Sequence, residues 1–332
     1  MCNFAPAKSI KKTTNSMKLT GRRESQNVDD RRGLSSGAKA GVGGGILAVI
    51  LGIVMSLFGG GGGGGGIDLG SIISGGGGGL GDILGQMTGG SPTAEQVDTT
   101  KFTEEEKALA RECRQILAST EDVWTKVFAE YNLPNQMEGK RGVYTKPTLV
   151  LFTNSVSSSC GTASASVGPF YCSGDQNLYI DLSFFTEMKR QLGVNGSTFA
   201  YAYVIAHEIG HHVEFLTGSL TKAHQDMSNA GSNKAKNQIS VRLELLADYY
   251  AGVWAHYEDE MYHSLEYGDL EKGLELANAI GDDWLQKQAT GRAVEESFTH
   301  GTSEQRKRWL KKGFQTGDMR TSTFQVANYN DL

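Results

Sequence analysis

Cysteine is scarce in this chain, which has four among 332 residues. Only Cys160 and Cys172 lie close together, in a segment rich in small residues and turns. A disulfide between them would suit an extracytoplasmic protein. Two free thiols in a cytosolic loop would fit the same spacing equally well, so the sequence leaves both states open.

A basic surface interleaved with aromatic residues is also missing from most of the chain. The net charge is −5, but residues 1–45 carry nine Lys and Arg against three Asp and Glu, a local surplus of +6. The remainder therefore carries a net charge of −11. This acidic main part gives no basis for a nucleic-acid partner.

No Lys or Arg occurs between Lys39 and Lys101, and this interval contains an apolar run at residues 42–58. The run has a length at the short end of the roughly 17–25 residues that span a bilayer. All nine basic residues of the tail precede it, so the positive-inside rule predicts a cytoplasmic N-terminus and an exported remainder. A cleaved signal peptide and a buried core helix are the alternatives, but a cleavage site is not evident and polyglycine suits a core helix poorly.

Residues 59–100 are of low complexity, with runs of glycine at 59–66 and 75–79. This composition cannot bury a core and predicts a flexible tether. The expected organisation is a basic cytoplasmic tail at 1–41, a transmembrane anchor at 42–58, a Gly-rich linker at 59–100 and a globular domain at 101–332.

The globular part shows strand patterns first and helical patterns afterwards, which favours an α+β domain. Thr103 begins a capping-box pattern, and the helix that it starts is expected to break near residues 119–120 and to end before Pro134. Strands are expected at 148–152 and 178–182, with helices thereafter.

The residues best suited to chemistry form a His-Glu-x-x-His motif. His207 and His211 are four residues apart in an apolar, helix-compatible stretch, so both imidazoles can bind one metal ion from the same helix face. Glu208 lies one position round, where it can reach a water at the metal without being a ligand. Surface histidines are the alternative, but Ile205 and Ile209 indicate an inner helix, where imidazoles need partners.

A catalytic zinc site needs a third protein ligand. Glu244 and Asp248 are four residues apart on a second apolar helix, where unpaired acids would be costly; a solvated acidic face is the alternative. We expect Glu244 to complete the ligand set and Asp248 to accept the free ring N–H of His207. This set would leave Zn²⁺ an open position, with Glu208 as the general base.

Several blocks of the chain resemble the family of neutral zinc metallopeptidases of the YpfJ type, which is widespread in bacteria. The blocks are residues 17–25, 30–33, 168–172, 179–185, 207–212, 241–255, 280–283 and 297–303. The resemblance implies a membrane-anchored peptidase domain of gluzincin type, with a small sheet and helices. It also implicates His300, because gluzincins need a His or Tyr that donates to the developing oxyanion. A helix-cap or core histidine is the alternative.

The remaining histidines and a basic stretch are interpreted as supporting or surface groups. These are His212, His224, His256 and His263, together with Arg306, Lys307, Arg308, Lys311 and Lys312. The basic stretch is expected to form a solvated helix face or, alternatively, a contact to anionic lipid.

Three functions are compatible with the sequence. They are a peptidase acting on proteins or peptides near the membrane, a zinc hydrolase of another kind such as one acting on cell-wall amide bonds, and a scaffold with structural zinc. Structural sites are usually closed by Cys and His ligands, so the open position and Glu208 argue against the scaffold. The sequence therefore predicts a membrane-anchored zinc metallopeptidase.

Overall fold

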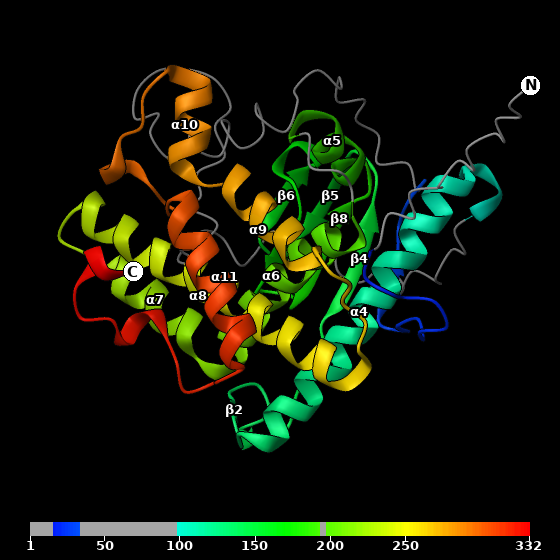
Figure 1. The fold of residues 1–332 in the computed structure, drawn as a ribbon, viewed down its shortest axis with the longest axis horizontal. Coiled ribbons are helices and arrows are strands. Elements are labelled where there is room, and N and C mark those ends of the chain that lie inside the picture. Colours follow the sequence, from blue (N-terminus) through cyan, green and yellow to red (C-terminus); the bar gives the residue numbers. More distant parts are fainter. Residues whose placement is uncertain (1–15, 34–97, 193–196) are drawn as a thin grey trace, which may run out of the picture.

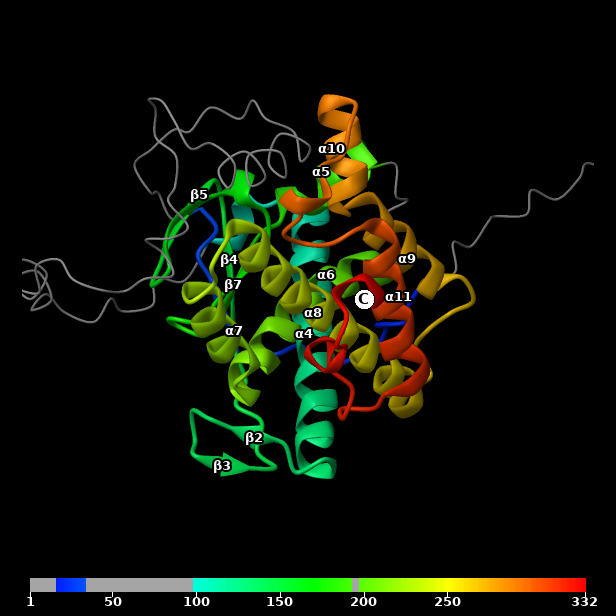
Figure 2. The same ribbon diagram turned by 90° about the vertical axis from the view of Figure 1, so that its left-hand side faces the viewer.

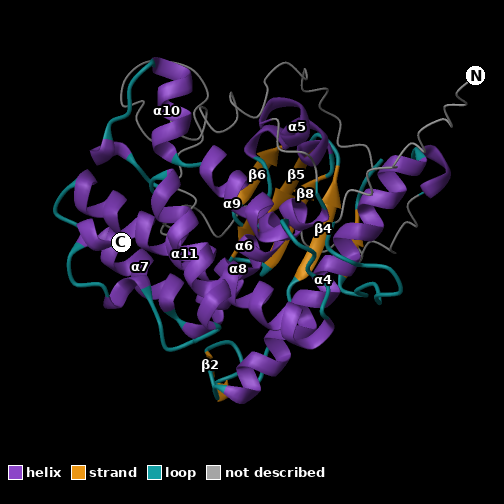
Figure 3. Cartoon of the chain, in the orientation of Figure 1, coloured by secondary structure: helices purple, strands orange, loops and turns teal. Residues whose placement is uncertain are grey.

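The computed structural model describes residues 16–33, 98–192 and 197–332. These parts contain eight α-helices and eight short strands. The helices predominate, and most of the strands gather in one region while β2 lies apart from them, as Figure 3 shows. The predicted α+β class is confirmed.

A four-stranded sheet in the order β1-β4-β8-β7 lies at the centre of the strand region. The strands are β1 (Val28–Asp30), β4 (Thr148–Phe152), β8 (Asn177–Asp181) and β7 (Phe170–Cys172). The first three are parallel, and β7 runs antiparallel to β8. β4 and β8 are almost fully buried, as strands inside a parallel sheet usually are.

Two small hairpins accompany the sheet. The strands β2 (Pro134–Asn135) and β3 (Lys140–Arg141) form one, and β5 (Ser155–Ser158) and β6 (Gly161–Ser164) form the other. Cys160, at the tip of the second hairpin, forms a disulfide with Cys172 in β7. The structure thus contains the disulfide, whose presence the sequence did not decide.

Helix α4 (Glu104–Glu130) begins at the predicted capping box of Thr103 and Glu106. It is continuous through residues 119–120, so the predicted break there is wrong. Thr120 donates its hydroxyl hydrogen to the carbonyl of Leu117, and the Ser119 hydroxyl is buried in a side-chain network. Because the Thr120 hydroxyl bonds a carbonyl of the preceding turn and the Ser119 hydroxyl bonds other side chains, neither interrupts the helix.

The remaining helices follow the sheet in sequence. They are α5 (Ser183–Leu192), α6 (Thr198–Thr217), α7 (Ser219–Ser228), α8 (Asn233–Tyr262), α9 (Asp269–Ala279), α10 (Asp282–Thr290) and α11 (Ser303–Thr316). The helices α8 and α11 lie side by side in Figures 1 and 2. They touch at Gly252 and Gly313, since a Cβ on Gly252 would lie 2.2 Å from the carbonyl oxygen of Leu310.

Residues 16–33 belong to this folded body, whereas the sequence assigned them to a cytoplasmic tail. The segment, blue in Figure 1, adds β1 to the sheet beside β4. Met17 and Leu19 are buried in the main hydrophobic core. A short 3₁₀ helix at Thr99–Lys101 lies just before α4.

The predicted membrane anchor at residues 42–58 lies outside the described residues, as does the linker up to residue 97. Within the parts that the structure describes, no helix combines the length and the apolar character needed to cross a bilayer.

Candidate metal centre

Helix α6 carries the two motif histidines on one face. Its N-terminus is capped by Ser197, whose hydroxyl accepts the N–H of Ala200, and its apolar residues pack into the core. The rings of His207 and His211 lie edge to face, with centroids 4.9 Å apart. The four-residue spacing therefore brings both imidazoles to one point, as the sequence predicted.

Helix α8 brings Glu244 to the same point. Its Oε2 lies 3.3 Å from Nε2 of His207, and its Oε1 lies 3.6 Å from Nε2 of His211. One ligand atom from each of the three residues lies within 4.8 Å of the others. Two imidazole nitrogens and one carboxylate oxygen at this spacing match the donor set of a catalytic zinc site.

Each histidine is oriented by a carboxylate on its other ring nitrogen. His207 Nδ1 lies 2.8 Å from Oδ1 of Asp248, and His211 Nδ1 lies 2.9 Å from Oε2 of Glu214. Both carboxylates are buried. Such a partner fixes the ring and leaves Nε2 as the metal-binding nitrogen.

Arg306 is buried in the core beside this centre, so its assignment to a solvated helix face is wrong. Its Nε donates to Oδ2 of Asp248 at 2.8 Å, and its Nη2 donates to Oδ1 at 3.0 Å. The Tyr203 hydroxyl donates to the same Oδ1 at 2.6 Å. Together with His207, these donors fully surround a carboxylate that would otherwise be a costly buried charge.

The electrostatic environment favours positive charge on the two histidines. Burial acts to lower the pKa of His207, but Asp248 and Glu244 outweigh it and raise that pKa to about 10. Burial also acts to lower the pKa of His211, but Glu214 and Glu244 outweigh it and raise that pKa to about 9. A site that stabilises imidazolium in this way also favours a bound cation.

Glu208 is not one of the three ligands and contacts the sheet. Its Oε2 accepts the backbone N–H of Tyr171 at 3.0 Å, in strand β7. Burial raises the pKa of Glu208, while the charges of His207 and His211 act to lower it. A half-buried carboxylate whose pKa is raised is suited to accept and return a proton.

His212 is fully buried and supports the same strand. Its Nδ1 is 2.9 Å from the hydroxyl of Tyr171, and its Nε2 is 2.7 Å from the carbonyl oxygen of Thr145. Burial lowers the pKa of His212 to about 4, so the ring is neutral. The interpretation as a supporting histidine agrees with this position.

His300 lies near Glu244 and is held by Asp282. Its Nδ1 is 3.1 Å from Oδ1 of Asp282, and Oδ2 of Asp282 accepts the backbone N–H groups of Thr299, His300 and Gly301. Burial acts to lower the pKa of His300, but Asp282 and Glu244 raise it above its ordinary value. The ring can therefore carry a proton toward the metal centre.

Sequence reasoning missed Glu214, Arg306 and the role of Asp282. Glu214 is three residues after His211, a spacing that places two side chains side by side on a helix. Arg306 shares the buried face of α11 with Trp309, Leu310 and Gly313. The helical spacing of these residues could have predicted that Arg306 is buried, unlike its basic neighbours. No sequence pattern predicts the contact between Asp282 and His300.

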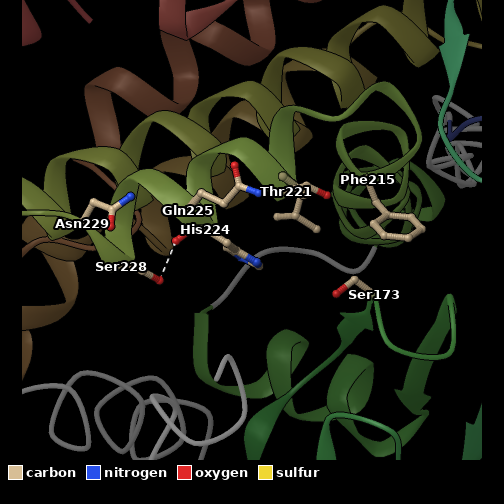
Figure 4. Close-up of a pocket in the computed structure, with 8 residues that line it drawn as sticks. Ser173, Phe215, Thr221, His224, Gln225, Ser228 and Asn229 are labelled. Carbon is tan, nitrogen blue, oxygen red and sulfur yellow. Dashed lines mark hydrogen bonds between the residues drawn. The ribbon is translucent and has the colours of Figure 1, made fainter. Parts of the chain in front are cut away.

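A cavity of about 410 Å³ lies beside α7 (Figure 4). Phe215, one turn beyond His211 on α6, forms part of its wall together with Leu220 and Ser173. The remaining wall is polar and comes from Thr221, His224, Gln225, Ser228 and Asn229. Burial and the charge of His211 lower the pKa of His224.

Comparison with known proteins agrees with the metal centre. A family model described as "Putative neutral zinc metallopeptidase" matches residues 17–324. The "Uncharacterized protein YpfJ" of Escherichia coli K12 is 43% identical over 307 residues, which is 91% of this chain and 96% of that protein. An uncharacterized protein of Mycobacterium bovis is 42% identical over 195 residues, which is 56% of this chain and 64% of that protein. The comparison with solved structures found no match.

Proposed function

The chain belongs to this family of neutral zinc metallopeptidases, and from that premise we propose that it is a membrane-attached peptidase that hydrolyses peptide bonds of proteins or peptides. The observation that carries the proposal is the separation of roles at the centre. His207, His211 and Glu244 converge on one point, whereas Glu208 lies beside them without joining the ligand set.

The cofactor is Zn²⁺, for which His207, His211 and Glu244 form the metal site. Bound zinc supplies Lewis acidity, which polarises the scissile carbonyl and makes water a nucleophile at neutral pH. The protein contributes the fixed orientation of the ligands, through Asp248 and Glu214 behind the two rings.

Glu208 acts as the proton carrier. Its carboxylate takes a proton from the attacking water and then delivers it to the leaving amine. The N–H of Tyr171 holds one carboxylate oxygen in place, so the other is free to face the substrate. Desolvation raises the pKa of Glu208, which brings it closer to the value that suits both the uptake of a proton from water and the later release of that proton to the amine.

His300 donates to the oxyanion that develops on the scissile carbonyl. Asp282 bonds Nδ1 of the ring, which leaves Nε2 as the donor. The fixed position of Asp282, held by three backbone N–H groups, makes this donor preorganised. The domain is thereby proposed to be of gluzincin type, with a glutamate ligand and a histidine donor.

The substrate lies extended along β7. This strand is at one edge of the four-stranded sheet as the described residues show it, and Tyr171 within it contacts the proton carrier. An extended peptide can add to such an edge through main-chain hydrogen bonds. The cavity beside Phe215 then takes a side chain next to the scissile bond, with an apolar end at Leu220 and a polar rim.

Substitution of Thr221 by Trp tests the cavity's role, because Thr221 lines the cavity and is exposed. The Thr221→Trp enzyme should bind zinc normally but lose activity most on peptides with large residues at one position. Lys222→Trp is the matched control, since Lys222 is the adjacent exposed residue and does not line the cavity. Equal activity profiles in the two variants would exclude this subsite.

We propose that the protein is located at a membrane, to which residues 42–58 attach it. The disulfide between Cys160 and Cys172 supports an oxidising, extracytoplasmic compartment for the domain. Attachment to the membrane would place the metal centre close to membrane proteins and to exported proteins at the membrane surface.

A profile of new peptide termini in membrane fractions tests the proposed activity. Fractions from cells that carry the wild-type chain should contain cleaved fragments that are missing with Glu208→Gln. Identical protein fragments together with altered cell-wall amides would favour the other zinc hydrolase. No difference of either kind would favour a scaffold.

A further inference from the structure

Two further carboxylates, which are not part of the metal centre, are buried. Glu121, in the middle of α4, and Glu258, near the end of α8, are 1% and 0% exposed. A buried carboxylate is costly unless it is paired with a cation and hydrogen-bonded. Residues 16–33 supply the cation that pairs with Glu258 and most of the partners of Glu121.

Arg22 pairs with Glu258. Its Nη1 and Nη2 donate to the two carboxylate oxygens at 2.8 and 3.2 Å, across 236 residues of sequence. The guanidinium also stacks on the ring of Tyr262, 3.6 Å from its centroid. Ser119 and Ser264 donate their hydroxyl hydrogens to the same carboxylate, which completes its coordination by hydrogen bonds.

Glu121 is surrounded by three residues of the same N-terminal segment. Ser25 Oγ lies 2.5 Å and Asn27 Nδ2 lies 2.7 Å from Oε1, and Arg23 Nη2 lies 2.9 Å from Oε2. Lys146 is the further cation, at 3.7 Å from Oε2. Folding of α4 into the core therefore depends on the segment that precedes the apolar run.

The backbone of the segment is integrated as well. β1 pairs in parallel with β4, with Val28 opposite Leu149. The N–H of Leu149 donates to the carbonyl of Asn27, and the N–H of Arg31 donates to the carbonyl of Leu151. Since β4 is a central strand, β1 is a part of the sheet and not a surface attachment.

This arrangement conflicts with a single membrane crossing between residues 33 and 98. Such a crossing would place β1 and β4, which are hydrogen-bonded neighbours, on opposite faces of the bilayer. The sequence of residues 59–97 contains no second apolar run of spanning length that could bring the chain back. We propose that residues 16–33 and 98–332 lie on the same side of the membrane.

The charge argument for the opposite topology is weakened by the same contacts. The positive-inside rule counted nine basic residues before the run. Five of them are ion-paired in the folded protein: Lys18, Arg22, Arg23, Arg31 and Arg32. Their charges are therefore engaged with carboxylates and are not free to interact with anionic lipid.

Thiol labelling of the full chain in its membrane tests the proposal. Thr20→Cys and Tyr267→Cys, each in a Cys2→Ser background, place one thiol at an exposed position on either side of the run; Tyr267 is 98% exposed. The native Cys113 is buried, and the disulfide does not react. A maleimide that cannot cross membranes should treat the two positions alike: it should label both in sealed cells, or label both only after lysis. Labelling of denatured samples is the control that each introduced thiol is present. Labelling of one position from outside and of the other only after lysis would overturn the proposal.

A second measurement checks that the segment is docked in the membrane-bound protein. Arg22→Gln should lower the melting temperature of the full chain by more than about 5 °C, because it leaves Glu258 buried without its cation. Glu258→Gln in the same chain should recover part of the loss. The control is Arg31→Gln, since the Arg31 guanidinium pairs with Asp29 inside the segment. Equal melting temperatures for Arg22→Gln and Arg31→Gln would show that residues 16–33 are not docked and would refute the same-side arrangement.

Discussion

Gly210 and Ala247 are in direct contact at the level of the metal ligands. A Cβ on Gly210 would lie 2.9 Å from both the Cα and the carbonyl oxygen of Ala247, closer than a real Cβ approaches backbone. Gly210 lies between the two motif histidines and Ala247 precedes Asp248, so this contact sets how closely α6 and α8 approach. The distance from the histidines to Glu244 depends on it.

Gly210→Ala is therefore expected to impair the metal site. Alanine favours a helix over glycine by about 1 kcal/mol, so an isolated helix would gain stability. In this protein the added methyl group must push α8 away, which we expect to destabilise the fold by about 1–3 kcal/mol. Zinc titration and thermal unfolding should both show a loss. Gly231→Ala, where nothing lies within 4 Å, is the control; equal behaviour of the two variants would contradict the contact.

Glu208→Gln separates proton transfer from metal binding. The change keeps the volume and a hydrogen-bond acceptor for the N–H of Tyr171 but removes the base. We expect normal zinc content, an unchanged melting temperature and peptide hydrolysis lowered by about 10²–10⁴-fold. Glu244→Ala should instead lose tight zinc binding. Loss of zinc in Glu208→Gln, or full activity with zinc present, would show that the proposed roles are wrong.

Arg306→Met tests the support behind His207. Removing the guanidinium leaves the buried carboxylate of Asp248 without its cation, which we expect to destabilise the protein by about 3–5 kcal/mol. Zinc affinity should fall by about 10–100-fold, because His207 loses a fixed partner. Lys311→Met removes an exposed charge from the same helix and should change neither measurement. Similar zinc affinities in both variants would exclude a positioning role for Arg306.

Glu112→Gln gives a pH-dependent effect away from the metal centre. Burial raises the pKa of Glu112, and its Oε1 has no hydrogen-bond partner among the described residues. A carboxyl group whose pKa is higher in the folded than in the unfolded protein contributes stability at a pH below its unfolded-state pKa. This stability is lost as the pH rises through its folded-state pKa. Glu112→Gln should therefore be more stable than wild type at pH 7 by about 1–2 kcal/mol. Chemical denaturation should show the difference vanishing toward pH 4, whereas a constant difference would contradict the titration.

The disulfide predicts a specific pattern of thiols and stability. In unreduced, denatured protein, a thiol reagent should label Cys2 and Cys113 and leave Cys160 and Cys172 unmodified. Reduction, or Cys160→Ser together with Cys172→Ser, should destabilise the fold by roughly 3 kcal/mol through the entropy of the unfolded chain. Four reactive thiols before reduction would show that the bond is not formed.

The sequence by itself determined the parts of this protein that depend on local spacing. Two histidines four residues apart on an apolar helix must share a face, and Glu244 and Asp248 repeat that spacing on α8. The start of α4 at Thr103 and the burial of β4 follow from capping and hydrophobic pattern in the same way. These features required no knowledge of distant contacts.

Only the tertiary structure decided which distant side chains meet. Arg306 stands in a basic stretch, and its burial follows from the packing of α11 against α8, which brings it to Asp248 across 58 residues. The hydroxyls of Ser119 and Thr120 suggested a helix break, yet tertiary packing gave Ser119 a partner in Glu258 on α8. Residues 16–33 have the composition of a basic tail, and they join the fold because Glu121 and Glu258 need cations that lie far away in sequence. The cost of burying a charge without its partner is a property of the folded core, so local sequence patterns do not reveal it.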